Sequence, residues 1–125
     1  MCAGMGAGIG VAHGAAQAGI GERMVAVIGD STFFHSGITG LVNAVFNNHN
    51  FTLVILENGT TAMTGHQPHP GVDMANLDLS GFGRISIEDV VKAIGVPHVT
   101  LIKPYKVKKS IAAVKEAIAY QGVSV

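Results

Sequence analysis

Three short stretches of this chain are continuously apolar, and each ends in polar or turn-forming residues. They are Met24–Ile28, Thr52–Leu56 and Val99–Ile102. Continuous apolarity is typical of strands that are buried on both faces, as in a parallel sheet covered by helices. We therefore expect a strand over each stretch, and residues 123–125 look like the first residues of a fourth.

Helical periodicity fills the intervals between these strands. Apolar residues follow the i, i+3, i+4, i+7, i+8 spacing of one helix face at Ile38, Leu41, Val42, Val45 and Phe46. Ser86 and Asp89 resemble a capping box that opens a helix over 87–94, with Gly95 as its stop. A further helix is expected over 107–120, and the glycine-rich opening stretch is expected to be a packed helix. Strands alternating with helices predict an α/β fold of three layers, α/β/α, around a mostly parallel sheet.

The ends of the chain do not fit a self-contained domain. The sheet would have only three whole strands, and the opening helical segment has no strand before it. We therefore expect residues 1–125 to be a single partial domain, truncated at both ends. A natural short subunit that is completed by partners is the alternative.

Composition and charge exclude several classes of function. The 125 residues are 48% hydrophobic and 13% charged with a formal net charge of zero, so we expect a packed domain and no nucleic-acid partner. The opening stretch has no basic segment before it and is a poor membrane span, so no membrane partner is expected. The single cysteine, Cys2, excludes a disulfide framework and a cysteine-ligated cluster, and it favours a cytoplasmic location.

Polar side chains follow two of the predicted strands directly. Asp30 comes just after the first strand and Asn58 just after the second. A helix N-terminus near Asp30 favours a bound anion such as phosphate. The Asp30 carboxylate would compete with that phosphate for the same site. A metal ion that binds both the carboxylate and the phosphate would remove this conflict. Mg²⁺ prefers such carboxylate, amide and phosphate oxygens. Spacing alone leaves another interpretation open, in which Asp30 caps the following turn and Asn58 with Gly59 makes a β-turn.

The connection from 58 to 83 is longer than most loops in compact domains, which favours a functional role. Two of its histidines, His66 and His69, and His35 beyond the first strand are candidate acid–base or substrate-binding groups. We favour His35 and His66 as catalytic residues and give His69 less weight. Packing at a helix start, or simple exposure on a loop, is the alternative for these histidines. Phe33 and Phe34 either face an aromatic substrate or belong to the core.

The two polar strand ends carry a recognisable motif. Gly29-Asp30-Ser31, followed by a helix, a strand and Asn58, resembles the thiamine diphosphate motif, which begins Gly-Asp-Gly and ends in asparagine. The resemblance implies that Mg²⁺ is held by Asp30, Asn58 and the backbone carbonyl of Thr60. Ser31 departs from the motif, which has glycine at that position.

The surrounding residues, "GDSTFFHSGITGLVNAVFNNHNFTLVILENGTTAMTGHQPHPG", narrow this resemblance. They are similar to the C-terminal thiamine diphosphate domain of the indolepyruvate:ferredoxin oxidoreductase α-subunits, within the 2-oxoacid:ferredoxin oxidoreductases. The similarity spans the whole chain and is strongest from Val25 to Gly71. It implies the thiamine diphosphate-binding (PP-type) fold, with thiamine diphosphate and Mg²⁺ as cofactors. The implied cofactor-binding residues are Gly29, Asp30, Ser31, Asn58, Thr60, Thr61 and Ala62.

The same resemblance implies an activity and a set of partners. The activity is oxidative decarboxylation of an aryl 2-oxoacid, indolepyruvate, to an acyl-CoA with ferredoxin as electron acceptor. The partners are CoA, ferredoxin, a β-subunit, and the pyrimidine-binding and ferredoxin-like domains of the α-subunit, which carry the iron–sulfur clusters and the glutamate that activates the cofactor. This segment alone is expected to be inactive. Pyruvate or another 2-oxoacid as substrate, or a non-catalytic α/β module, is the alternative.

Overall fold

A short parallel sheet forms the centre of the molecule, a computed structural model that describes residues 4–20, 23–73 and 83–125. Its strands are β1 (Met24–Gly29), β2 (Phe51–Leu56) and β3 (Val123–Ser124), in the order β1-β2-β3. Both pairings are parallel, and β1 aligns with β2 from Met24 opposite Phe51 to Gly29 opposite Leu56. The carboxyl ends of β1 and β2 therefore meet at one edge of the sheet.

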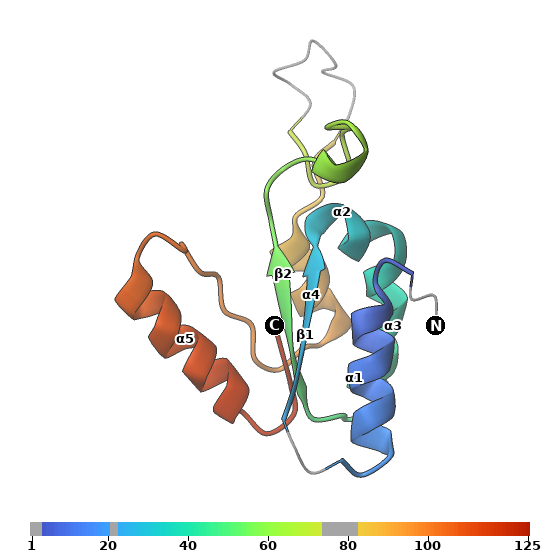
Figure 1. Cartoon of the computed structure of the whole chain (residues 1–125), viewed down its shortest axis with the longest axis vertical. Helices are drawn as coiled ribbons and strands as arrows, with labels where there is room; N and C mark the ends of the chain where they lie inside the picture. Colours follow the sequence, from blue (N-terminus) through green and yellow to red (C-terminus); the bar gives the residue numbers. More distant parts are fainter. Residues whose placement is uncertain (1–3, 21–22, 74–82) are drawn as a thin grey trace.

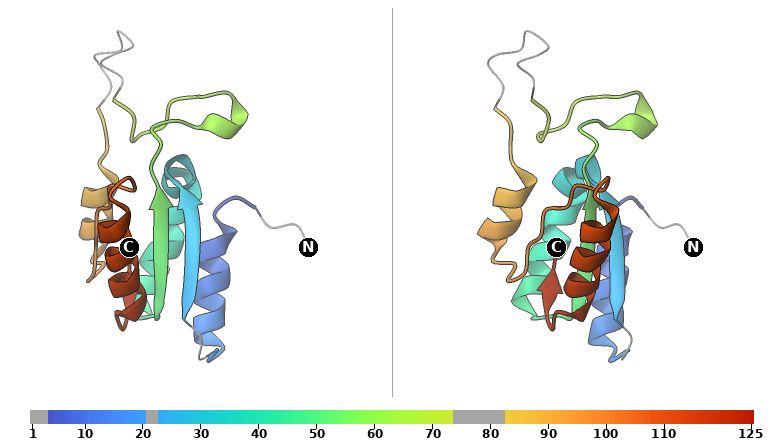
Figure 2. Two further views of the ribbon diagram at one scale, coloured as in Figure 1. Left: turned by 60° about the vertical axis from the view of Figure 1, so that its left-hand side comes forward. Right: turned by 90° about the vertical axis from the view of Figure 1, so that its left-hand side faces the viewer.

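Helices cover both faces of the sheet (Figure 1). The helical elements are α1 (Ala7–Gln17), α2 (Asp30–Thr32), the π-helical turn Phe33–Gly37, α3 (Ile38–Phe46), the 3₁₀ turn Ala62–Thr64, α4 (Ile87–Ile94) and α5 (Val107–Ala119). Figure 2 shows α1 and α3 on one face and α5 on the other. The predicted three-layer α/β/α architecture is confirmed. None of the helices in the described part of the chain is long and apolar enough to cross a membrane.

Local sequence signals account for α4. The Ser86 hydroxyl accepts a hydrogen bond from the Asp89 N–H at 3.2 Å, and Gly95 ends α4 with a φ of 92°. Because a positive φ strains any residue with a Cβ, glycine suits this position. The predicted range and cap of α4 are confirmed, and α5 ends one residue before the predicted Tyr120.

The helix expected from Ile38 onward is confirmed as α3, and a one-turn helix and a π-helical turn connect it without a break to Asp30. The predicted strand over residues 99–102 is wrong. Only the start of this segment pairs with β3, through His98 and Thr100, which bond the backbone of Val125 at 2.9 and 2.8 Å.

The expectation that β1 is buried on both faces is also wrong. Ala26 and Ile28 are buried, whereas Val25 is 44% and Val27 is 54% exposed. The buried side belongs to the core with α1 and α3, where a Cβ at Gly40 would lie 2.9 Å from a methyl group of Ile9. The opposite side faces an open cavity of about 580 Å³ in front of α5.

Helix α3 likewise buries only part of its predicted apolar stripe. Leu41 and Ala44 are buried, but Val42 is 47% and Phe46 is 86% exposed. The packed face is thus narrower than the apolar pattern of the sequence.

Candidate functional site

Asp30 lies where β1 ends and the next helix begins, at the carboxyl edge of the sheet. Its side chain is almost fully buried, at 2% exposure. Oδ1 accepts a hydrogen bond from the N–H of Ser31 at 2.8 Å, and Oδ2 accepts from the N–H groups of Asn58 and Gly59 at 2.9 and 2.8 Å. The two predicted strand ends are therefore joined through this carboxylate.

The environment of Asp30 keeps its carboxyl group ionised. Burial alone would raise the pKa of Asp30, because it disfavours the charged form. The backbone N–H groups of Gly59, Ser31 and Asn58, with a smaller contribution from the nearby His69, outweigh burial and lower the pKa below its ordinary value of 3.8. The edge of the sheet thus carries a fixed negative charge at neutral pH.

Asn58 begins a tight turn at the end of β2. Its side-chain oxygen accepts a hydrogen bond from the Thr60 N–H at 2.9 Å, and Gly59 has a φ of 74°. Asn58 therefore closes a turn through its side chain, and this turn brings the N–H groups of Asn58 and Gly59 to Asp30. Within the described residues, no group of three or more His, Cys, Asp or Glu side chains is placed to hold a metal ion. A cation at this edge would need neutral oxygens alongside the carboxylate.

Ser31 and Thr61 connect the start of the helix to the long loop. The Thr61 hydroxyl donates a hydrogen bond to the Ser31 hydroxyl at 2.8 Å, and the Thr61 N–H bonds the carbonyl of Gln67 at 2.9 Å. Serine at position 31 is therefore accommodated by a partner in the loop. Ala62, the remaining predicted cofactor-binding residue, is exposed at the start of the 3₁₀ turn.

Gly29 shows how this edge fits a phosphate group. Its φ of −83° and ψ of 162° suit any residue, and a Cβ built there would meet no atom within 4 Å. The described part of the chain thus gives no steric or conformational reason for glycine. Open space beside backbone N–H groups at the start of a helix is what close approach of a phosphate requires.

The three candidate histidines differ in their surroundings. His35 and His66 are exposed, and His66 has a φ of 62° in its loop. His69, which received the least weight, is buried with Nε2 only 3.1 Å from Asp30 Oδ2, and its Nδ1 accepts the Gly71 N–H at 3.1 Å. No local sequence signal marks His69, because its position depends on how the loop folds back over the sheet.

Arg84 is a further residue that the sequence did not single out. Its Nε–H donates to the carbonyl of Gly71 at 3.0 Å, and its guanidinium lies 3.3 Å from the Glu57 carboxylate. These contacts tie the far end of the loop to the end of β2. Cys2 and residues 74–82 of the long connection lie outside the described residues.

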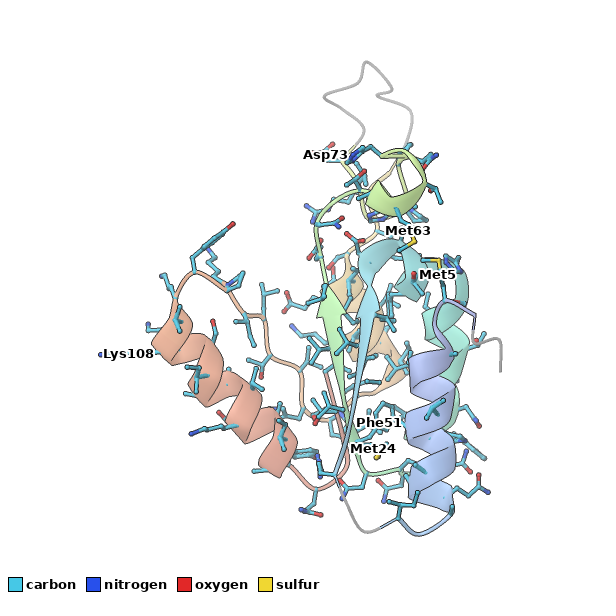
Figure 3. The ribbon with its side chains drawn as sticks, in the orientation of Figure 1. Met5, Met24, Phe51, Met63, Asp73 and Lys108 are labelled. Atoms are coloured by element: carbon cyan, nitrogen blue, oxygen red, sulfur yellow. The ribbon has the colours of Figure 1, made fainter. Side chains whose placement is uncertain are left out.

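Phe33 and Phe34 have separate roles. Phe33 is fully buried in the core, which confirms the core alternative for this residue. The centroid of the Phe34 ring lies 5.7 Å from the centroid of the His69 ring, and the Phe34 ring packs edge-on against Phe33. Figure 3 shows the exposed Met63 at this upper edge of the molecule, with Met24 and Phe51 at the opposite end.

The chain was compared with known proteins. All of residues 1–125 match the family described as "Thiamine pyrophosphate enzyme, C-terminal TPP binding domain". The subunit IorA of indolepyruvate oxidoreductase is 46% identical in Archaeoglobus fulgidus and 42% in Thermococcus kodakarensis, each over 97% of this chain. The chain spans about a fifth of these relatives, 19% and 20% of their length.

Solved structures show the same fold at lower sequence identity. A 2-oxoglutarate:ferredoxin oxidoreductase from Magnetococcus marinus superimposes with a TM-score of 0.80 at 21% identity, over 95% of this chain and 43% of that one. A thiamine diphosphate-dependent 4-hydroxybenzoylformate decarboxylase from Rhodococcus jostii has a TM-score of 0.65 at 24% identity, over 96% of this chain and 22% of that one. These likenesses support the predicted α/β fold class.

Proposed function

Because this chain belongs to the thiamine pyrophosphate enzymes as their C-terminal TPP-binding domain, we propose that it anchors the diphosphate of thiamine diphosphate through Mg²⁺. The observation that carries the proposal is the ionised, buried Asp30 at the carboxyl edge of β1 and β2, beside the unfilled space at Gly29. Open α/β sheets bind ligands at this edge. The same place combines a cation-binding charge with room for phosphate.

Each residue of the edge has a proposed role. Asp30, the side-chain oxygen of Asn58 and the carbonyl of Thr60 would hold the Mg²⁺ ion. The hydroxyls of Ser31 and Thr61, which already contact one another, would donate to diphosphate oxygens. When bound, thiamine diphosphate supplies the electron sink that makes loss of CO₂ from a 2-oxoacid possible. His35 and His66, exposed near this edge, are the proposed acid–base or substrate-binding groups.

We propose the wider reaction from the names of the relatives. Their shared name supports an oxidoreductase that acts on indolepyruvate. Conversion to an acyl-CoA, with ferredoxin as electron acceptor, is the further part of this proposal. CoA, the pyrimidine-binding and ferredoxin-like domains with their iron–sulfur clusters, and a β-subunit complete this proposal. Turnover of indolepyruvate, phenylpyruvate and pyruvate by the complete enzyme tests it. A preference for pyruvate would contradict the aryl substrate.

The cofactor proposal is tested by calorimetric titration of thiamine diphosphate into the complete protein, with and without Mg²⁺. We expect saturable binding that requires Mg²⁺. Absence of binding at millimolar cofactor would favour the second candidate, a non-catalytic α/β module in which Asp30 only fastens the turn after β2. The hydrogen bonds that Asp30 accepts from that turn favour this alternative.

A further inference from the structure

A buried nitrogen beside Asp30 has no hydrogen bond within the described part of the chain. Nε2 of His69 lies 3.1 Å from Asp30 Oδ2 with a side-chain exposure of 4%, yet it is not aligned for a hydrogen bond to any described residue. Because Nδ1 accepts the Gly71 N–H, the proton of the neutral ring is on Nε2. An unsatisfied buried donor costs about 1–3 kcal/mol, so its presence calls for an explanation.

The two carboxylate oxygens of Asp30 accept different numbers of hydrogen bonds. Oδ2 already accepts from the N–H groups of Asn58 and Gly59, which use both of its lone pairs. Among the described residues, Oδ1 accepts a hydrogen bond only from the Ser31 N–H, which leaves one of its lone pairs free there. A cation that reaches Asp30 would therefore bind Oδ1, while Oδ2 remains on the protein side against His69.

We propose that His69 is a positioning residue: its Nε2–H group, 3.1 Å from Oδ2, attracts this oxygen electrostatically without a hydrogen bond and so holds the Asp30 carboxylate with Oδ1 presented to the metal ion of the cofactor. This inference rests on the proposed function above. Metal-bound carboxylates are commonly oriented by such outer partners, whose loss typically weakens metal binding about 10–100-fold.

The surroundings of His69 hold its ring in one place. Phe34 packs against the ring, and the Gly71 N–H fixes Nδ1. A Cβ at Gly71 would lie 2.7 Å from the Phe34 ring and 3.1 Å from the His69 ring, so no side chain fits there. Arg84 binds the Gly71 carbonyl from the other side of the loop. The contacts of the ring with Phe34 and with the Gly71 N–H thus hold the unbonded Nε2 against Oδ2.

Two substitutions separate the roles of the ring nitrogens. In His69→Gln the amide nitrogen reaches about as far as Nε2, whereas in His69→Asn the amide reaches only the position of Nδ1. The complete enzyme would be stripped of metal and titrated with Mn²⁺ at saturating thiamine diphosphate, with free Mn²⁺ read from its room-temperature EPR signal. We expect His69→Asn to weaken Mn²⁺ affinity about 10-fold or more and His69→Gln to stay within about 3-fold of the wild type.

The outcomes distinguish this inference from the function on which it rests. Wild-type affinity in both variants, equal losses in both, or a loss in His69→Gln alone would overturn the positioning role through Nε2. A wild-type enzyme that binds neither Mn²⁺ nor thiamine diphosphate would instead overturn the proposed function. If His69→Asn does not fold, His69→Phe takes its place, because its ring still packs on Phe34 without a nitrogen. We expect the same loss of affinity, and wild-type affinity would overturn the inference.

Discussion

The two faces of the sheet differ in how completely they are covered. On the face of α1 and α3, Ile28, Leu41 and Leu53 are each at most 6% exposed. On the face of α5, Val25 and Val27 of the same strand are about half exposed, and Val25 borders a cavity of about 580 Å³. Strand β1 therefore has one packed side and one open side.

This difference shows from which side the site is supported. Asp30 continues β1 directly into a helix that carries Phe33 into the packed core. Among the described residues that line the open cavity, Asn58 at the end of β2 contacts the Asp30 carboxylate, through its backbone N–H. We infer that the stability of the site depends on the α1/α3 face and only weakly on the α5 face.

Phe33→Ala is expected to give the largest effect. Removing this fully buried ring next to the site should cost about 3–5 kcal/mol of unfolding free energy, measured by urea denaturation. A cost below about 1 kcal/mol would show that the α1/α3 face is not closely packed.

Gly40→Ala tests the contact between α1 and α3. The added methyl group would lie 2.9 Å from Ile9, and overpacking of this kind costs about 1–3 kcal/mol. The control is Gly10→Ala in α1, where a Cβ meets no atom within 4 Å. This control should be neutral or stabilising by up to about 1 kcal/mol, because alanine favours the helix. Equal effects of the two variants on the urea midpoint would contradict the close approach.

The pH dependence of stability should reflect Asp30. Its pKa is lowered in the folded chain, so the unfolded chain binds this proton more readily. The stabilisation is present above the unfolded pKa, near pH 4, and is lost as the pH falls through the lower folded pKa. In urea titrations at pH 6, 4 and 3, the wild type should lose more stability than Asp30→Asn. Parallel losses would indicate that the carboxylate is not stabilised by the N–H groups around it.

Val27→Thr should have the smallest effect, within about 0.5 kcal/mol, because this side chain is 54% exposed on the open face. The matched variant is Ile28→Thr, one residue along the strand, which places a hydroxyl in the core and should cost at least about 1 kcal/mol. Similar costs by urea denaturation would mean that the two faces are equally packed.

Elements with local signals were predicted well from the sequence. The cap at Ser86, the stop at Gly95 and the strand ends at Asp30 and Asn58 all depend on neighbouring residues. The exposure of Val27 could not be predicted, because an apolar strand has the same composition whether one or both faces are covered.

The tertiary contacts of the site could not be predicted from the sequence either. His69 reaches Asp30 only because the loop returns over the edge of the sheet, where Arg84 holds it through Gly71. The amino-acid types at residues 66–71 and 84–85 do not indicate that the loop folds back over the edge of the sheet. The sequence therefore identified the carboxylate, whereas it named His69 only as the histidine candidate with the least weight.

The central claim is that Asp30 anchors the cofactor through a divalent cation. Calorimetric titration of thiamine diphosphate with Mg²⁺ into wild-type and Asp30→Asn forms of the complete protein tests it most directly. We expect Mg²⁺-dependent binding by the wild type and a loss of at least about 100-fold in the variant, as direct ligands should matter no less than their outer partners. Equal affinity in the two proteins would contradict the assignment.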